Sequence, residues 1–341
     1  KIESNDPEIF FVKTKRSNPR LQKIIGLSSI LDKKKPDIVF LDNDPGSLQA
    51  VEISKWCKKN NSKCVIQSCE NLSFDYKSSF KRAGIKGFLL SFIKNYLNFL
   101  SKKNIDYIFT INNAGTEIFK NIGYKNVQKI PLGFNENLFN DFPEKRTEIR
   151  KKLELNNTVI AYFGRIVPEK GIHILLKALA NLKYLEWTFI LDDFELYKNS
   201  YFETISNLIS ELDLKSRIKY IKADHKEIVD YMNASDITVL ASISTPKWKE
   251  QYGRVIPEAM ACKNSVIVAN SGALPELVGD AGFVFEEKNI DELAQNIENL
   301  IKNQNICSDY KEKAYQRAQK HLSIKSQFEI YDKIFKEIVN K

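Results

Sequence analysis

The sequence predicts an α/β protein with two domains, each built on a parallel β-sheet covered by helices. The chain has 341 residues, which at about 150 residues per domain corresponds to two domains. Short apolar, β-branched runs alternate with helical segments along the whole chain, and this is the pattern of parallel sheets. The alternation restarts near residue 158, after a polar stretch at 135–146 that we interpret as the linker.

The N-terminal domain is expected to occupy residues 1–134. Strands are predicted at 9–13, 37–41, 64–67, 107–111 and 128–130, and helices at 21–31, 47–58 and 84–101. The chain begins at Lys1, with neither an initiator Met nor an apolar leader segment. We therefore expect the start of this domain to be missing from the sequence.

The C-terminal domain is expected to occupy residues 135–320, and residues 321–341 are expected to form a last helix that packs back on the first domain. Strands are predicted at 158–163, 187–191, 218–221, 237–240 and 265–268, and helices at 170–182, 201–212, 225–232, 257–262, 274–278, 291–302, 308–320 and 325–340. Open parallel sheets bind ligands beyond the carboxyl ends of their strands. Functional residues should therefore follow strands, in a cleft between two facing domains.

The composition is that of a globular protein, with 43% hydrophobic and 28% charged residues. It excludes disordered, collagenous and coiled-coil proteins, and no run approaches the roughly 18 apolar residues of a transmembrane helix. The net charge of +9 predicts either a solvated lysine-rich surface or attraction to an anionic partner such as a nucleotide, a membrane surface or nucleic acid. The five cysteines form no C-x-x-C pair, which indicates a reducing compartment and no zinc site.

The first motif that carries chemistry follows the strand predicted at 158–163. Gly164 lets the backbone turn tightly, Arg165 projects from the loop, and Lys170 stands at the start of the next helix. Two cations beside a helix N-terminus form a site suited to a diphosphate. Ordinary surface cations in a loop are the alternative interpretation.

The second motif is the segment 250–258, in which Glu250 and Glu258 flank seven residues. Gly253 permits a close backbone approach. Pro257 suits the first turn of a helix, so Glu258 is expected in that turn and Glu250 in the loop before it. Both carboxylates could accept hydrogen bonds from vicinal hydroxyls on a ribose or a sugar ring. A simple acidic helix start would explain Glu258 alone.

The third motif is the segment 270–276, in which a strand runs through small residues into a helix start. It is expected to form either a backbone nest for an anion or a plain turn.

The helix predicted at 84–101 carries an apolar stripe at helical spacing, which we interpret as a core face. The stripe consists of Leu89, Phe92, Ile93, Tyr96, Leu97 and Leu100. Basic residues surround it: Lys81, Arg82, Lys86, Lys94, Lys102 and Lys103. The alternative is a basic amphipathic face that rests on an anionic membrane surface.

In their order and spacing, these motifs resemble the family 4 retaining glycosyltransferases of group 1, which have the GT-B fold of two Rossmann-like domains. The matching stretches are FGRIVPEKG at 163–171, ASD and VLAS within 234–242, EQYGRVIPEAMACKNSVIVANSGALPELVGDAGFVF at 250–285, and DELAQNIENLI at 291–301. PDIVFL at 36–41 and KIPLGFNENLF at 129–139 match more loosely. The resemblance covers about residue 30 to the end, and the E-x7-E segment is its most specific part.

The resemblance implies a hexosyltransferase that moves a sugar from a nucleotide-diphosphate donor to a glycan or lipid-linked acceptor. Such enzymes retain the anomeric configuration and use neither a metal nor another cofactor, because cationic side chains stabilise the leaving phosphate. Arg165 and Lys170 would neutralise the leaving diphosphate, and Glu250 would contact the donor sugar near the reacting carbon. Glu258 would hold the ribose.

The remaining donor-binding residues implied by the resemblance are backbone positions. The amides around Tyr252, Gly253, Arg254 and Val255 would cradle a phosphate, and Gly164 would line the same site. The resemblance also implies an enzyme of cell-surface polysaccharide synthesis with no nucleic-acid partner. The cysteine pattern predicts the cytoplasm, and the basic amphipathic alternative for the helix at 84–101 would add a peripheral contact to the inner face of the membrane.

The chain departs from the family pattern at two places. Many relatives carry a His near the acceptor, where this chain has Ser68, Cys69, Glu70 and Asn71. We assign Glu70 and Asn71 to the acceptor side. At 191–194 the sequence LDDF replaces a glycine-rich stretch that bears on recognition of the base.

Asp42 and Asp44 form a D-x-D pattern like the metal motif of the other glycosyltransferase fold, but Pro45 and Gly46 follow, so we interpret the pattern as a turn. Three other functions stay open: a sugar-nucleotide epimerase of the same fold, a non-catalytic nucleotide-sugar-binding module, and a glycosidase that uses the paired carboxylates.

Overall fold

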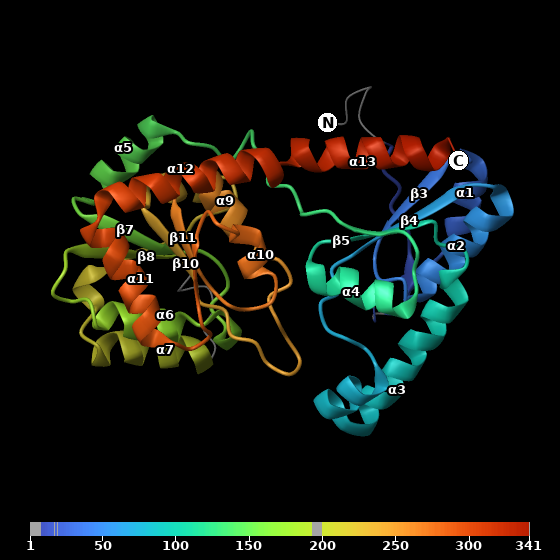
Figure 1. Cartoon of the computed structure of the whole chain (residues 1–341), viewed down its shortest axis with the longest axis horizontal. Helices are drawn as coiled ribbons and strands as arrows, with labels where there is room; N and C mark the ends of the chain where they lie inside the picture. Colours follow the sequence, from blue (N-terminus) through green and yellow to red (C-terminus); the bar gives the residue numbers. More distant parts are fainter. Residues whose placement is uncertain (1–7, 17, 19, 193–199, 341) are drawn as a thin grey trace. The chain divides into compact units, whose positions relative to one another are not determined.

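The computed structural model describes residues 8–16, 18, 20–192 and 200–340 (Figure 1). Asp193 and Phe194, which belong to the departure at 191–194, lie outside the described residues. The chain divides into two compact units. Unit 1 consists of Lys1–Thr110, Gly115–Lys129 and Lys333–Lys341, and unit 2 of Ile111–Ala114 and Ile130–Asp332.

Unit 1 is built on a parallel sheet in the order β3-β4-β5-β6. These strands are β3 (Ile38–Asp42), β4 (Lys63–Ser68), β5 (Tyr107–Thr110) and β6 (Val127–Lys129). The helices are α1 (Leu27–Lys34), α2 (Leu48–Asn60), α3 (Tyr76–Lys102) and α4 (Asn113–Ile122), and a short antiparallel pair, β1 (Thr14–Lys15) and β2 (Lys23–Ile24), precedes them. The central strand β4 is buried almost throughout, as expected for a parallel sheet between helices.

Unit 2 is built on a six-stranded parallel sheet in the order β12-β11-β10-β7-β8-β9. The strands are β7 (Thr158–Tyr162), β8 (Trp187–Asp192), β9 (Ile218–Ile221), β10 (Ile237–Leu240), β11 (Ser265–Ala269) and β12 (Phe283–Phe285). The central strands β10 and β11 are buried along their whole length. Continuous apolar runs such as VIVA in β11 therefore reflect burial on both faces of the sheet.

Helices cover both faces of this sheet. They are α5 (Pro143–Lys152), α6 (Ile172–Ala180), α7 (Ser200–Glu211), α8 (Ile228–Ala234), α9 (Val255–Ala261), α10 (Leu274–Val278), α11 (Ile290–Lys302) and α12 (Gln304–His321), with short 3₁₀ turns η1 (Pro168–Lys170) and η3 (Lys215–Arg217). Helix α6 contacts α7 and α11, whereas α9 contacts α8 and α12. In Figure 1, α6 and α7 lie below the strands and α9 and α12 above them.

The last helix, α13 (Ile324–Val339), belongs to both units, because unit 2 ends at Asp332. Its C-terminal part lies in unit 1, where the ring of Phe335 packs 6.1 Å from the rings of both Phe40 and Phe109. Aromatic pairs at this separation add to the apolar burial. The chain thus leaves unit 1 after Lys129 and returns to it within one helix.

The predicted α/β class with two parallel sheets is confirmed, but several predicted elements are wrong. The described residues at 8–13 form no strand. They are exposed, and an apolar run needs a neighbouring strand to pair with. The helix predicted at 21–31 begins only at Leu27, because Lys23–Ile24 pairs with Thr14–Lys15. The predicted linker 135–146 already contains the start of α5, where Pro143 takes the first helical position.

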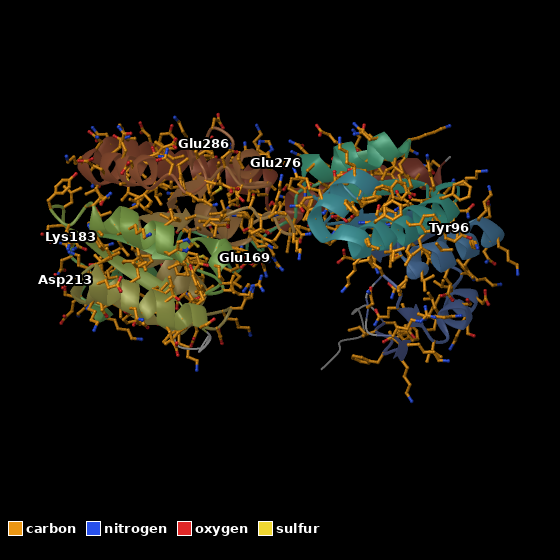
Figure 2. All side chains as sticks on the ribbon, turned by 90° about the horizontal axis from the view of Figure 1, so that it is seen from below. Tyr96, Glu169, Lys183, Asp213, Glu276 and Glu286 are labelled. Atoms are coloured by element: carbon orange, nitrogen blue, oxygen red, sulfur yellow. The ribbon has the colours of Figure 1, made fainter. Side chains whose placement is uncertain are left out.

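The helix predicted at 84–101 is longer than predicted, and it directs its apolar face to solvent instead of to the core. It begins at Tyr76 and has non-helical backbone angles at Ala83 and Gly84. The stripe expected in the core is mostly exposed: Leu89, Phe92 and Tyr96 each keep 56% of their surface. Tyr96, one of these exposed residues, is labelled in Figure 2. The face that packs inward is polar, because the buried Glu70 and the partly buried Asp44 bind Lys94 there.

Candidate functional site

The site of interest lies where the connections of the unit 2 sheet diverge. Strands β8 and β9 follow β7 on one side, while β10, β11 and β12 follow on the other. Read from β9, this is the strand order 3-2-1-4-5-6 of doubly wound sheets, whose switch point lies between the first and fourth strands. Here these strands are β7 and β10, which pair directly. The loops after β7 and β10 therefore begin side by side.

The loop after β7 is pressed against the end of β10. The backbone N–H of Ile243 donates to the carbonyl of Glu169 at 2.8 Å. Gly171 has a φ of 67°, and a Cβ at this position would lie 1.8 Å from the carbonyl oxygen of Ala241. Only glycine fits such a contact. This approach holds η1, and with it Lys170, over the carboxyl end of β10.

The third motif supports Glu250 from the other side. The N–H of Ala273 donates to the carbonyl of Glu250 at 3.0 Å. Gly272 has a φ of 56°, and its Cβ would lie 2.0 Å from the same carbonyl oxygen. The segment 270–276 therefore serves as a backbone support that sets the position of Glu250.

Lys170 and Glu250 meet at this point. The Nζ of Lys170 lies 2.6 Å from Oε2 of Glu250, and their side chains are only 14% and 8% exposed. The Ser242 hydroxyl donates to the same carboxylate oxygen at 2.8 Å. The Lys170 ammonium also lies 5.4 Å from the centre of the Trp248 ring. A cation and a carboxylate from the two sides of the switch point are thus held in one place.

Arg165 stands apart from this pair, with an exposed side chain on a fixed backbone. The Tyr162 hydroxyl donates to the carbonyl of Arg165 at 2.7 Å. Burial raises the pKa of Tyr162 well above its usual value, Glu250 is among the groups that raise it further, and Arg165 opposes the rise. Tyr162 therefore stays a hydrogen-bond donor at neutral pH. Gly164, with a φ of 137°, begins the turn.

The segment between the two glutamates turns sharply into α9. Gly253 has a φ of 83°, and its Cβ would lie 2.5 Å from Cδ2 of Leu274. The Tyr252 hydroxyl donates to the carbonyl of Leu132 at 2.7 Å, so this side chain has a structural role. Arg254 is exposed and directly precedes Val255, the first residue of α9. The Tyr252 side chain is therefore held by the protein itself, whereas the Arg254 side chain is exposed.

Glu258 lies in the first turn of α9, as its spacing from Pro257 predicts. Burial raises the pKa of Glu258 from 4.5 to about 7, and the charge of Arg254 opposes the rise. The carboxyl therefore titrates near neutral pH.

The two residues assigned to the acceptor side lie in unit 1, directly beyond the end of β4. Glu70 and Asn71 are both buried. Glu70 forms ion pairs with Lys94 and with Arg20, the latter at 3.3 Å. The Glu70 carboxylate thus supports α3. An acceptor that contacts this carboxylate would have to compete with Lys94 and Arg20 for it.

Sequence reasoning missed Ser242 and a second contact nearby. The N–H of Ser244 donates to Oε2 of Glu287 at 2.9 Å, and the hydroxyls of Ser244 and Ser271 lie 3.0 Å apart. Ser242 and Ser244 closely follow β10, and this position is the one signal that could have drawn attention to them. Among the described residues, no group of three or more His, Cys, Asp or Glu side chains could hold a metal ion.

Comparison with known proteins identifies the family. The model of the family "Glycosyl transferases group 1" matches residues 145–317, which is 173 of the 341 residues. The chain therefore belongs to the group 1 glycosyltransferases.

Curated relatives match about half of this chain. A glycosyltransferase of Methanocaldococcus jannaschii is 30% identical over 148 residues, covering 42% of this chain and 38% of the relative. The D-inositol 3-phosphate glycosyltransferase of Corynebacterium aurimucosum is 25% identical over 52% of this chain and 43% of its own. The capsular polysaccharide biosynthesis glycosyltransferase CapM of Staphylococcus aureus is 29% identical, and the match covers 48% of this chain and 41% of CapM. The chain thus spans about two fifths of the length of these relatives.

Solved structures support the GT-B fold across both units. A glycosyltransferase from Rickettsia africae has a TM-score of 0.75 at 24% identity, covering 92% of this chain and 79% of its own. HepE from Anabaena has a TM-score of 0.72 at 23% identity, and the match covers 91% of this chain and 82% of HepE. At these identities the likeness concerns the fold.

The buried ion pair generates a stability prediction. Replacing Lys170 with Met should cost about 3 kcal/mol of unfolding free energy, because it leaves the Glu250 carboxylate buried without its cation. Adding E250Q to K170M should recover most of this loss, since a neutral amide needs no counter-charge. Chemical denaturation of wild type, both single variants and the double variant measures the coupling.

Lys302 provides a matched control, because it pairs with Glu298 and lies 5.5 Å from the Tyr184 ring, but in an exposed position. K302M should leave the denaturation midpoint nearly unchanged, since exposed pairs contribute little. Equal effects of K170M and K302M, or simple additivity of K170M and E250Q, would contradict the structural assignment.

Glu258 generates a pH prediction. Its folded pKa of about 7 exceeds the ordinary value of 4.5, so between these values the folded state holds a proton that the unfolded state releases. The unfolding free energy of wild type relative to E258Q should therefore rise as the pH falls from 7 towards 4.5, by at most about 3 kcal/mol.

Denaturation midpoints at pH 8, 7, 6 and 5 measure this difference. E148Q, which changes an exposed residue of α5, serves as control and should follow wild type. Parallel pH profiles for wild type and E258Q would show that Glu258 titrates normally.

Proposed function

We propose that this protein transfers a sugar from a nucleotide-diphosphate donor to a glycan or lipid-linked acceptor. The observation that carries the proposal is the meeting of Lys170 and Glu250, 2.6 Å apart, at the switch point of the unit 2 sheet. Ligands of doubly wound sheets bind outside the carboxyl ends of the strands at this point. A cation for phosphate and a carboxylate for sugar hydroxyls are the two chemical functions that a nucleotide sugar requires.

The leaving group would be stabilised by Lys170 and Arg165. When the bond between the anomeric carbon and the diphosphate oxygen breaks, the nucleoside diphosphate takes the electron pair and gains negative charge. Lys170 offers a compact ammonium, and exposed Arg165 offers a planar fork that can bind two oxygens. Cations that are already oriented stabilise this charge without further reorganisation.

Glu250 would orient the transferred sugar. In the unliganded site its Oε2 accepts from both Lys170 and Ser242. A bound diphosphate competes for Lys170, and the freed carboxylate can then accept hydrogen bonds from donor sugar hydroxyls. Ser242 would keep the carboxylate in place during this exchange.

Glu258 would bind the ribose of the donor. An ionised carboxylate accepts hydrogen bonds from two vicinal hydroxyls, and hydrogen bonds to a charged group are the stronger kind. Because the pKa of Glu258 is about 7, nucleotide binding should be favoured above neutral pH. The backbone at 252–255 would complete the phosphate site.

Named relatives favour the same donor class and a role in the synthesis of cell-surface polysaccharides. Structures of HepE from Anabaena contain UDP and UDP-glucose, and CapM of Staphylococcus aureus is named for capsular polysaccharide biosynthesis. We extend both properties to this chain as part of the proposal, together with retention of the anomeric configuration.

Replacing each of the two glutamates individually tests their proposed roles. E258Q should weaken binding of a nucleoside diphosphate by one to two decades, because charged hydrogen bonds are worth about 1.5–3 kcal/mol. E250Q should leave that affinity nearly unchanged while transfer collapses. Calorimetric titration with uridine, guanosine and adenosine diphosphates, alongside a transfer assay, measures both.

The other functions predict different outcomes of this experiment. A glycosidase would show no nucleotide dependence, a binding module would show the Glu258 effect with no transfer to lose, and an epimerase would turn over the donor without an acceptor. Equal loss of nucleotide affinity in E250Q and E258Q would contradict the division of roles between the two glutamates.

Metal dependence provides a further test. We expect transfer to survive EDTA, because Lys170 and Arg165 are proposed to supply the positive charge that a divalent ion would otherwise give. The assay compares initial rates with EDTA, with EDTA plus excess Mg²⁺ and with EDTA plus excess Mn²⁺. Complete loss in EDTA that either ion restores would overturn this part of the proposal and direct attention to Asp42 and Asp44.

A further inference from the structure

Helix α3 exposes an apolar face to solvent. Its outward side chains keep large parts of their surface, from 41% for Ile93 to 73% for Ile85. The exposed members are Tyr76, Phe80, Ile85, Phe88, Leu89, Leu90, Phe92, Ile93, Tyr96 and Phe99, which we call the α3 apolar face. Scattered apolar residues are normal on a surface, but a contiguous set along one helix marks a binding site.

Polar contacts on the opposite side of α3 fix this orientation. Lys94 is 4% exposed and forms ion pairs with Glu70 and, at 3.6 Å, with Asp44. Asn98 accepts a hydrogen bond from the Tyr124 hydroxyl at 2.9 Å, and Ser101 donates to the carbonyl of Pro45 at 2.9 Å.

Close packing adds to this constraint. Gly46 leaves room for the inward face of α3, since its Cβ would lie 2.6 Å from Nδ2 of Asn98. Rotating the helix to bury its apolar face would take Lys94 away from the buried carboxylate of Glu70 and the partly buried carboxylate of Asp44, at a high cost. The exposure is therefore built into the fold of unit 1.

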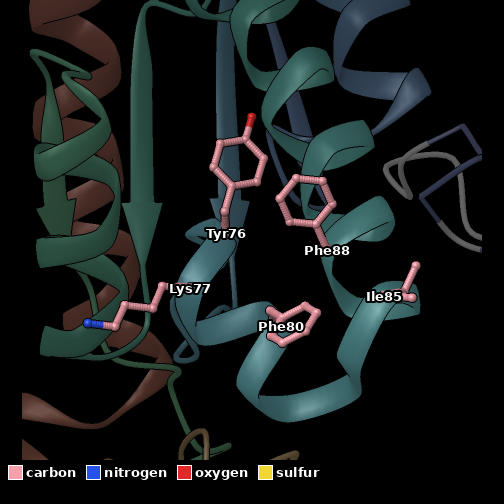
Figure 3. A pocket seen from close by; sticks show the side chains of 5 residues that line it. All are labelled: Tyr76, Lys77, Phe80, Ile85 and Phe88. Carbon is pink, nitrogen blue, oxygen red and sulfur yellow. The ribbon is translucent and has the colours of Figure 1, made fainter.

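A bend in the helix shapes one end of the face. Ala83 and Gly84 leave the helical conformation. The two arms of the helix flank an open hollow of about 520 Å³, lined by Tyr76, Lys77, Phe80, Ile85 and Phe88. Figure 3 shows Tyr76 and Phe88 side by side across it, with Lys77 pointing away. Their ring centres are 5.3 Å apart.

Every charged residue within α3 itself is basic, although the exposed carboxylate of Asp75 caps its first turn. No Asp or Glu occurs between Asp75 and Asp106. Lys77, Lys81 and Lys86 are exposed beside the bend. A second copy of this face would bring like charges together, which disfavours self-association. An anionic membrane surface matches both the exposed apolar side chains of the face and the lysines beside it.

We propose that the α3 apolar face docks the protein on an anionic membrane surface. The helix would lie in the plane of the interface, with its aromatic and aliphatic side chains at the acyl boundary and its lysines among the headgroups. None of the described helices is long and apolar enough to cross a membrane, so the contact is with one leaflet. The proposal goes beyond the proposed function, since docking requires neither donor nor transfer.

Cosedimentation with vesicles tests the proposal in the whole chain. Wild type should bind vesicles of phosphatidylcholine with 30% phosphatidylglycerol, and bind pure phosphatidylcholine much more weakly. K77E/K81E/K86E should lose about a hundredfold in affinity, since each basic residue near an anionic surface is worth about fivefold. F92S/Y96S/F99S should also lose binding, although its charge is unchanged.

A matched control carries the same charge change elsewhere. Lys151, Lys152 and Lys215 are exposed on unit 2, and K151E/K152E/K215E should bind vesicles within a few-fold of wild type. Thermal denaturation of each variant separates lost docking from lost folding.

A direct readout comes from F92W, whose fluorescence should be quenched by brominated lipids, while the tryptophans of wild type should not be. Equal losses in the two triple-lysine variants, or no quenching of F92W, would overturn the proposal. A wild-type dimer that F92S/Y96S/F99S converts to a monomer, without vesicle binding by wild type, would also overturn it and assign the face to self-association.

Discussion

The carboxyl ends of β7 and β10 impose the constraint on which the candidate site depends. The two strands are neighbours, but the chain leaves them in opposite directions, so two loops begin within a few ångströms of each other. Gly171 and Gly272 press backbone against backbone on either side, at distances that no side chain would permit. Because backbone contacts fix both loops, Lys170 and Glu250 meet at 2.6 Å and present opposite charges where a nucleotide sugar would place its phosphate and its hydroxyls.

Much of this site could be predicted from sequence, because its residues follow strands at short distances. Apolar runs identified β7 and β10, and parallel sheets direct the loops after them to one edge. The Lys170–Glu250 contact itself could not be predicted, since it depends on two glycine approaches between segments far apart in the chain. Ser242 was missed for a related reason, because its position after a strand is a weak signal without the partner that it contacts. The pKa of Glu258 likewise depends on tertiary burial.

Helix α3 shows where periodicity misleads. The spacing of Leu89, Phe92 and Tyr96 correctly predicts one apolar face, but periodicity does not reveal what that face contacts. The orientation is decided by Lys94, which meets Glu70 and Asp44 in the interior. These partners are distant in sequence, so Lys94 resembled an ordinary surface cation. The two units thus use buried ion pairs differently: in unit 2 the pair forms the candidate site, and in unit 1 it turns an apolar face outward.

Amide hydrogen exchange with and without a bound nucleoside diphosphate tests the central claim most directly. The nucleotide that raises the thermal midpoint most would be used at saturation, where a ligand at 100 times its dissociation constant adds about 2.7 kcal/mol. We expect slower exchange in three segments, 163–171, 242–258 and 270–274, because these form the loops at the switch point. Slower exchange confined to unit 1, or to segments away from β7 and β10, would contradict the account.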